Sequence, residues 1–193
     1  MKRIRTTRTL TTLVFAALTP VAALAHPGHV DIGAGFTAGL MHPLSGLDHV
    51  LMIVAVSAWA AQLAPAGRVI VAASLGLFVA VGALAAVAAP AGPALEAAIA
   101  LTVVGSGALL AAGRRWPAWI AASFAALFAF MHGLAHGAEG AATSGSYVLG
   151  VVAATVELAL LVSFLAARMR SHRGWLRLIG AMGAVAGAVV LFN

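Results

Sequence analysis

The sequence predicts an all-α integral membrane protein, with a cleavable signal peptide followed by a six-helix transmembrane bundle. Of its 193 residues, 63% are hydrophobic and only 8% are charged, a balance that a soluble domain of this size could not hide in one core. The net charge of +6 does not indicate a nucleic-acid-binding surface, because the basic residues stand in short clusters between apolar runs. We therefore expect the lipid bilayer, and no nucleic acid, as a partner.

Residues 1–25 have the pattern of a secretory signal peptide. A basic amino-terminal region precedes an apolar run and an Ala-Leu-Ala cleavage site that ends at Ala25. Cleavage there would make His26 the mature amino terminus, outside the cytoplasm, and leave 26–193 as a six-span transport domain. The alternative is an uncleaved first helix.

The remainder divides into six apolar runs of about 20 residues, the length needed to cross the hydrocarbon core of a bilayer. The breaks between them contain proline, glycine, serine or arginine, as helix ends and loops do. The expected spans are Phe36–Leu63, Arg68–Ala89, Pro93–Ala112, Pro117–His136, Tyr147–Ala167 and Leu176–Phe192.

The basic residues give the orientation independently of the signal peptide, since cytoplasmic loops collect lysine and arginine. With His26 outside, every basic residue of the mature chain falls in a loop that is inside. Both signals predict a bacterial inner-membrane protein with periplasmic amino and carboxyl termini. These cytoplasmic arginines are Arg68, Arg114, Arg115, Arg168, Arg170, Arg173 and Arg177.

Small residues let helix backbones approach closely where lipid provides no hydrophobic drive for association. Three Gly-x-x-x-Gly pairs are therefore candidate contact faces, although each match is weak in so glycine-rich a chain. They are Gly35 with Gly39, Gly133 with Gly137, and Gly183 with Gly187. The sequence leaves open whether the protein forms a homo-oligomer.

The most informative stretch is His42-Pro-Leu-Ser-Gly-Leu-Asp48-His49 in the first mature span. Ionisable groups inside a membrane are costly and mark functional sites. Imidazole and carboxylate together suit a divalent first-row metal, and the absence of cysteine from the sequence means that nitrogen and oxygen must hold it. We expect the helix to break between Pro43 and Gly46, which would let Asp48 join the two histidines.

A second cluster lies at the outer end of the fourth span. His132 and His136 are four residues apart and Glu139 follows three later, so all three share one helical stripe with metal-ligand spacing. Glu96, near the start of the third span, is a further candidate ligand, or only a first-turn acid favoured by the helix dipole. Glu157 lies mid-span with no obvious cation to pair with.

Depth along straight helices orders these groups. At about 1.5 Å per residue, His42 and His132 lie roughly 6 to 9 Å from the outer surface, and Asp48 and His49 roughly 18 to 20 Å. The arrangement predicts an inward path that begins at His136 and its neighbours. The alternative for any single histidine is a hydrogen bond to a neighbouring helix.

The two motifs together resemble the HupE/UreJ family of nickel and cobalt permeases associated with hydrogenase and urease. The resemblance covers essentially the whole chain, including the His26-Pro-Gly-His29 start. It implies uptake of Ni²⁺ or Co²⁺ from the periplasm for metalloenzyme assembly, with the ion as transported substrate rather than prosthetic group. It implies as metal ligands His42, Asp48, His49, His132, His136, Glu139 and, by position, Glu96.

A permease is not an enzyme, and the chain has no nucleotide-binding glycine-rich loop. Two alternatives remain. One is an intramembrane metal-dependent hydrolase with Glu139 or Asp48 as base, against which stands the absence of a His-Glu-x-x-His pattern. The other is a metal-binding sensor or assembly protein that does not transport.

Overall fold

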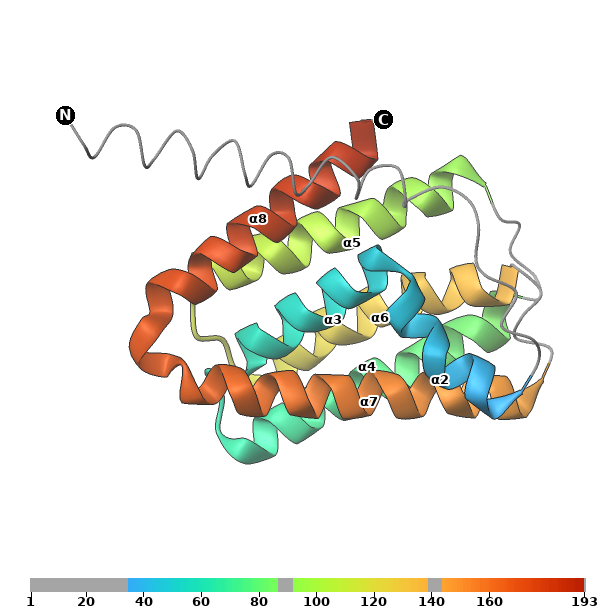
Figure 1. Ribbon diagram of the computed structural model, residues 1–193, viewed down its shortest axis with the longest axis horizontal. Helices are drawn as coiled ribbons and strands as arrows, with labels where there is room; N and C mark the ends of the chain where they lie inside the picture. The colour runs from blue at the N-terminus through green and yellow to red at the C-terminus, as the bar shows by residue number, and fades with distance from the viewer. Residues whose placement is uncertain (1–34, 87–91, 139–143, 193) are drawn as a thin grey trace.

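The computed structural model describes residues 35–86, 92–138 and 144–192. The segment 1–25, the histidines of the predicted mature amino terminus, and Glu139 lie outside these residues. Within the described ranges all regular structure is helical and there is no strand (Figure 1). The elements are α2 (Phe36–Ser45), α3 (Leu47–Ala60), α4 (Pro65–Ala85), α5 (Pro93–Ala112), α6 (Ala118–Ala138), α7 (Gly145–Arg168), the short 3₁₀ helix η3 (Arg170–His172) and α8 (Arg173–Phe192).

Helices α4 to α8 are each long and apolar enough to cross a membrane. The expected span Phe36–Leu63 instead forms two helices, α2 and α3, that meet at an angle of 80° and together are either one broken span or a re-entrant loop. The expected third span coincides with α5 at both ends. The last helix begins at Arg173, earlier than the expected Leu176, because η3 leads directly into it.

The bend falls at Gly46, the carboxyl-terminal limit of the predicted break. Gly46 is extended, with φ −97° and ψ 119°, whereas Pro43 is inside α2. Ending the helix at Ser45 deprives the last carbonyl groups of their intrahelical partners. The Ser45 hydroxyl donates a hydrogen bond of 2.7 Å to the His42 carbonyl oxygen, which satisfies one of them. The chain can therefore change direction within a low-dielectric interior without leaving that acceptor unpaired.

Helix α3 occupies the centre of the bundle and contacts each of the other long helices (Figure 1). From Met52 to Ala60 it is buried at every position except Val54. Around it the most extensive pairings are α4 with α6, α5 with α8, and α2 with α7. The histidine-bearing start of α3 is thus surrounded by other helices rather than by lipid.

Glycines permit these close pairings. A side chain at Gly39 would collide with the backbone of α7 at Tyr147, and one at Gly150 with the backbone of α2. Gly133 and Gly137 likewise meet the backbone of α4, and Gly187 meets α5. The three expected contact faces are confirmed only in part, because a Cβ added at Gly35 or Gly183 would meet no atom of the described residues within 4 Å.

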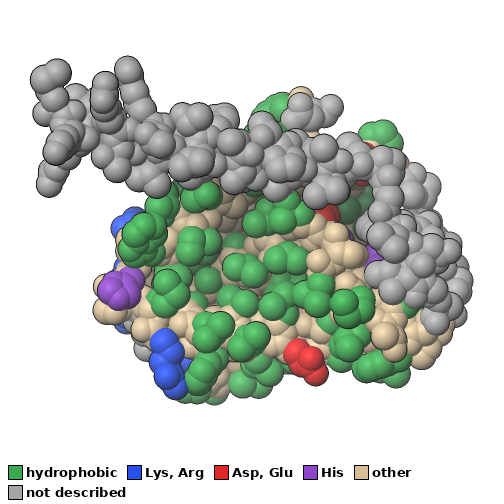
Figure 2. Space-filling view, viewed as in Figure 1, with side chains coloured by type: hydrophobic (Ala, Val, Ile, Leu, Met, Phe, Trp, Pro, Cys, Tyr) green, Lys and Arg blue, Asp and Glu red, His purple; other side chains and the backbone are tan. Residues whose placement is uncertain are grey.

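The arginine-bearing loops gather at one end of the bundle, which we call the arginine end (Arg114, Arg115, Arg168, Arg173 and Arg177). Two hydrogen bonds tie these loops together: the Trp59 indole donates to the Arg114 carbonyl oxygen at 3.0 Å, and Arg177 Nε donates to the Ala111 carbonyl oxygen at 2.8 Å. Between the ends, the visible surface is mostly hydrophobic (Figure 2). This distribution is that of a multi-pass membrane protein.

Candidate metal centre

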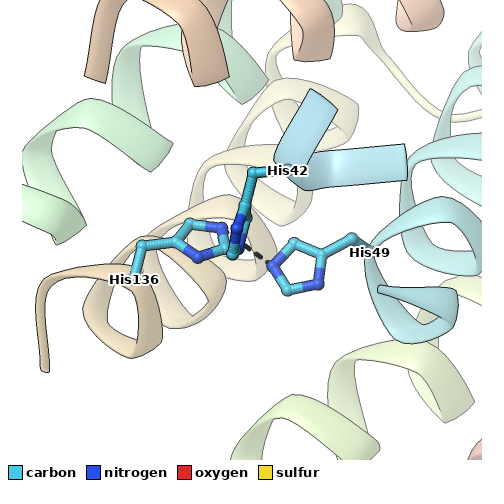
Figure 3. A group of neighbouring side chains, drawn as sticks. All are labelled: His42, His49 and His136. Atoms are coloured by element: carbon cyan, nitrogen blue, oxygen red, sulfur yellow. Dashed lines mark hydrogen bonds between the residues drawn. The ribbon is translucent and has the colours of Figure 1, made fainter. Parts of the chain in front are cut away.

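Four histidines from three helices converge where α2 meets α3. His42 is in the last turn of α2, His49 in the first turn of α3, and His132 and His136 on the inner face of α6. All four are buried, and His132 and His136 are 0% and 1% exposed. The rings of His42, His49 and His136 point toward one another (Figure 3). Imidazoles held this far from water need partners or a ligand.

The bend at Gly46 makes this convergence possible. On a straight helix, His42 and His49 would be separated by about 10 Å along the axis. Their ring centroids are 5.9 Å apart, and the His42 ring lies 4.4 Å from that of His136. The expected difference in depth between His42 and His49 is therefore wrong, because the rise per residue was counted along one continuous helix.

The ligand atoms form two groups that could each hold a metal ion. One consists of His42, His49 and His136, and the other of Asp48, His49 and His132; within each group the ligand atoms lie within 4.8 Å of one another. His49 belongs to both. Three nitrogen and oxygen ligands would leave further coordination positions of such an ion open to water.

Hydrogen bonds fix which nitrogen of His49 faces an ion. Its Nδ1 lies 3.0 Å from Asp48 Oδ1, and a carboxylate only accepts, so Nδ1 carries the proton. The other ring nitrogen, Nε2, faces His136 Nε2, 2.8 Å away. Two nitrogens bound at right angles to one ion at about 2.1 Å would lie about 3.0 Å apart. The observed separation thus matches an edge of a coordination sphere as well as a hydrogen bond.

A similar argument applies to His132, through Thr102 of α5. The Thr102 hydroxyl donates its proton to the Ile99 carbonyl oxygen at 2.6 Å and so must accept at 2.8 Å from His132 Nε2. Nδ1 of His132 is left with the lone pair, and it makes no hydrogen bond among the described residues. A buried acceptor without a partner costs about 1–3 kcal/mol. A metal ion would satisfy it.

The structure does not bring every predicted ligand to this cluster. Glu96 is exposed in the first turn of α5 and belongs to neither group, a position that fits the helix-dipole alternative. Glu157 is exposed on α7, and His172 is exposed at the arginine end. Glu139 follows the last described residue of α6, so its place at the outer end of the cluster stays a prediction.

Two neighbours of the cluster were not found from the sequence. Thr102 looks like any threonine in an apolar span, and nothing local indicates that its hydroxyl meets a histidine 30 positions later. The Tyr147 ring packs against His42 with centroids 5.7 Å apart. The only sequence signal for Tyr147 is its position at the start of a span; that it lies opposite Gly39 is known from the structure.

Together the fold and the cluster define a class: a multi-pass helical membrane protein with a buried centre of histidine and carboxylate. Comparison with known proteins identifies the family within this class. The HupE / UreJ protein family matches residues 13–190. The chain is 39% identical over 187 residues to Protein HupE of Rhizobium leguminosarum bv. viciae, an alignment that covers 94% of this chain and 96% of that protein. The chain belongs to the HupE/UreJ family. No solved structure was found to match it.

Proposed function

We propose that this protein is a permease that carries Ni²⁺ or Co²⁺ from the periplasm across the bacterial inner membrane, for assembly of metalloenzymes such as hydrogenase or urease. Family membership supports the class of substrate. The observation that carries the proposal is the position of His49, which belongs to two buried ligand groups at once. A resident metal needs one complete site, whereas a transported ion needs successive sites between which it can move.

The order of the two groups follows from α6. His132 is one helical turn nearer the arginine end than His136, and positive loops mark the cytoplasmic side. The group of His42, His49 and His136 is therefore the outer one, and Asp48, His49 and His132 form the inner one. This differs from the depth counted along straight helices, which put His132 level with His42.

Transfer between the groups is a ligand exchange around one shared residue, His49. An ion held by His42, His49 and His136 exchanges two imidazoles for the Asp48 carboxylate and His132, while His49 stays bound. The ion thus keeps at least one protein ligand throughout, which avoids the large cost of an uncompensated charge in a low-dielectric interior. Glu139 is proposed as the outermost ligand, where it would attract the hydrated dication; Glu96 as a ligand remains a prediction.

The membrane potential favours inward movement. A dication gains about 4.6 kcal/mol per 100 mV of inside-negative potential, enough for roughly a thousandfold accumulation without another energy source. In the proposed orientation both termini of the mature chain are periplasmic. The outer group of His42, His49 and His136 then lies on the periplasmic side, and the membrane potential drives the ion inward from there.

Flux measured in proteoliposomes tests the proposal. Vesicles containing the purified protein should take up radioactive nickel, competed by cobalt, faster under an inside-negative potassium diffusion potential than without one. The His49→Ala variant should show the flux of protein-free vesicles, and His172→Ala, which removes an exposed histidine far from the cluster, should match wild type. Saturable nickel binding without flux would instead indicate a sensor or assembly protein, and metal-dependent release of a cleaved product would indicate a hydrolase.

A further inference from the structure

A cavity opens at the arginine end, away from the metal centre. Its volume is about 100 Å³, room for several water molecules and hence for a phosphate group. The ends of four helices surround it: α3, α5, α7 and α8. Its charged lining residues are Arg115, Arg173 and Arg177, and no carboxylate lines it.

The positive charge of this cavity has no counter-charge nearby. The three described carboxylates, Asp48, Glu96 and Glu157, are in the first turn of α3, the first turn of α5 and the interior of α7. The sequence has no acidic residue from 49 to 95, from 97 to 138 or from 158 to 193. Within the described ranges the arginines therefore lack an anionic partner, and a ligand with negative charge would complete the site.

The three guanidinium groups differ in the hydrogen bonds that they already make. Arg177 donates from Nε to the Ala111 carbonyl oxygen at 2.8 Å and from Nη2 to the Ala112 carbonyl oxygen at 3.4 Å, which holds it against the end of α5. The guanidinium groups of Arg115 and Arg173 make no hydrogen bond or ion pair among the described residues. One anchored and two uncommitted guanidinium groups thus face the same cavity, a donor set suited to phosphate oxygens.

Apart from the arginines and Gln62, the lining has no polar side chain, and the cavity lies at the level of the lipid headgroups. Leu110 and Leu176 form part of its wall. Trp119 and Trp175 lie near the arginine-end termini of α6 and α8 and are 70% and 63% exposed. Exposed tryptophans are typical of the interface between membrane and water. A free phosphate ion would use only the arginines, whereas a phospholipid would place its phosphate there and its glycerol and acyl chains against the apolar wall.

We infer that this cavity binds the phosphate headgroup of an anionic phospholipid of the cytoplasmic leaflet. Basic pockets between transmembrane helices on this side are the usual sites for such headgroups. The bound lipid would neutralise the arginines and join α8 to the ends of α3, α5 and α7.

Native mass spectrometry of the purified protein with phosphatidylglycerol tests this inference. Wild type should retain one phosphatidylglycerol molecule at detergent concentrations that strip phosphatidylcholine. Arg115→Gln/Arg173→Gln should lose it, with an apparent affinity lower by about tenfold or more. Arg114→Gln/Arg168→Gln is the matched control, because it removes two charges from the same end but neither residue lines the cavity; it should retain the lipid.

Three outcomes would overturn the inference. Retention of phosphatidylglycerol by Arg115→Gln/Arg173→Gln would place the lipid elsewhere. Equal loss in both double variants would mean general electrostatic attraction. Thermal stabilisation of wild type by inorganic phosphate, abolished in Arg115→Gln/Arg173→Gln but without retained lipid, would assign the cavity to the free anion. Because these arginines are exposed, circular dichroism should show the same helix content in all variants.

Discussion

His49 Nε2 lies 2.8 Å from His136 Nε2 at the buried centre of the bundle, although 87 positions separate the two residues in the sequence. This is hydrogen-bond distance, so the contact joins α3 to α6. In the proposed metal-bound state, the same two nitrogens would be ligands of the ion.

Substitution of His49 should remove both ligand groups, whereas substitution of His42 or His132 should remove only one. We expect wild type to bind one Co²⁺ per chain, because both ligand groups need His49. His42→Ala and His132→Ala should each still bind one ion more weakly. His49→Ala should bind more than about 100-fold more weakly, since loss even of an outer partner costs 10- to 100-fold. Titration followed by the visible absorption of bound Co²⁺ measures the affinity and the stoichiometry of each variant.

The control is His172→Ala, which should titrate like wild type because His172 is exposed at the arginine end. Unchanged Co²⁺ absorption in His49→Ala would refute the shared-ligand arrangement. A wild-type stoichiometry of two ions would show that the groups fill independently.

Asp48 has two roles that conservative variants can separate. It accepts the His49 Nδ1 proton at 3.0 Å, which orients the ring, and it supplies a negative charge for the ion. Asp48→Asn keeps an oxygen acceptor and should lower nickel affinity about tenfold, whereas Asp48→Ala loses acceptor and charge and should lower it about 100-fold. Glu157→Gln, at an exposed position outside both groups, should leave the affinity unchanged. Equal losses in the two Asp48 variants would mean that orientation of His49 contributes nothing.

Thr102 should act through His132 as a positioning residue. Thr102→Val keeps the shape of the side chain but removes the acceptor for His132 Nε2, so the ring no longer has a fixed tautomer. Nickel affinity should fall about tenfold, and Thr102→Ser should restore it. Nuclear magnetic resonance of ¹⁵N-labelled histidine should show the change in tautomer in Thr102→Val. A purely packing role for Thr102 would leave the tautomer unaltered.

The sequence was sufficient for the residue types of the site but not for its geometry. Histidines and a carboxylate in apolar spans stand out because few other polar groups are there. Their mutual distances depend on the 80° bend at Gly46, and no local pattern states its size. Counting depth along a straight helix consequently separated His42 from His49, whose rings are in fact neighbours.

The helix pairings show the same limit. Gly-x-x-x-Gly spacing predicted that Gly133 and Gly137 would allow a close contact, and both meet α4. The same spacing selected Gly183, around which nothing lies within 4 Å, while Gly150, the partner of α2, was in no such pair. Spacing identifies glycines on one side of a helix, but the neighbouring helix decides which side is covered.

Gly46 links the fold to the site, and its substitution should affect metal binding more than stability. Its φ of −97° is open to any residue, so Gly46→Ala introduces no backbone strain. An added Cβ would lie 2.8 Å from His49 Nδ1 and 2.9 Å from Asp48 Oδ1, so these two side chains must shift. The hydrogen bond between these two atoms must then lengthen or rotate. Nickel affinity should fall about tenfold, as expected when a ligand loses the hydrogen bond that orients it.

The thermal midpoint of Gly46→Ala in detergent should stay within a few degrees of wild type, because the displaced atoms belong to two side chains rather than to the backbone. Gly174→Ala is the matched control, since nothing lies within 4 Å of that glycine; it should leave both nickel affinity and thermal midpoint unchanged. A large drop in the thermal midpoint of Gly46→Ala with unaltered nickel affinity would mean that Gly46 serves the turn alone. Reduced affinity at constant stability would show that the helix break also sets the Asp48 and His49 geometry.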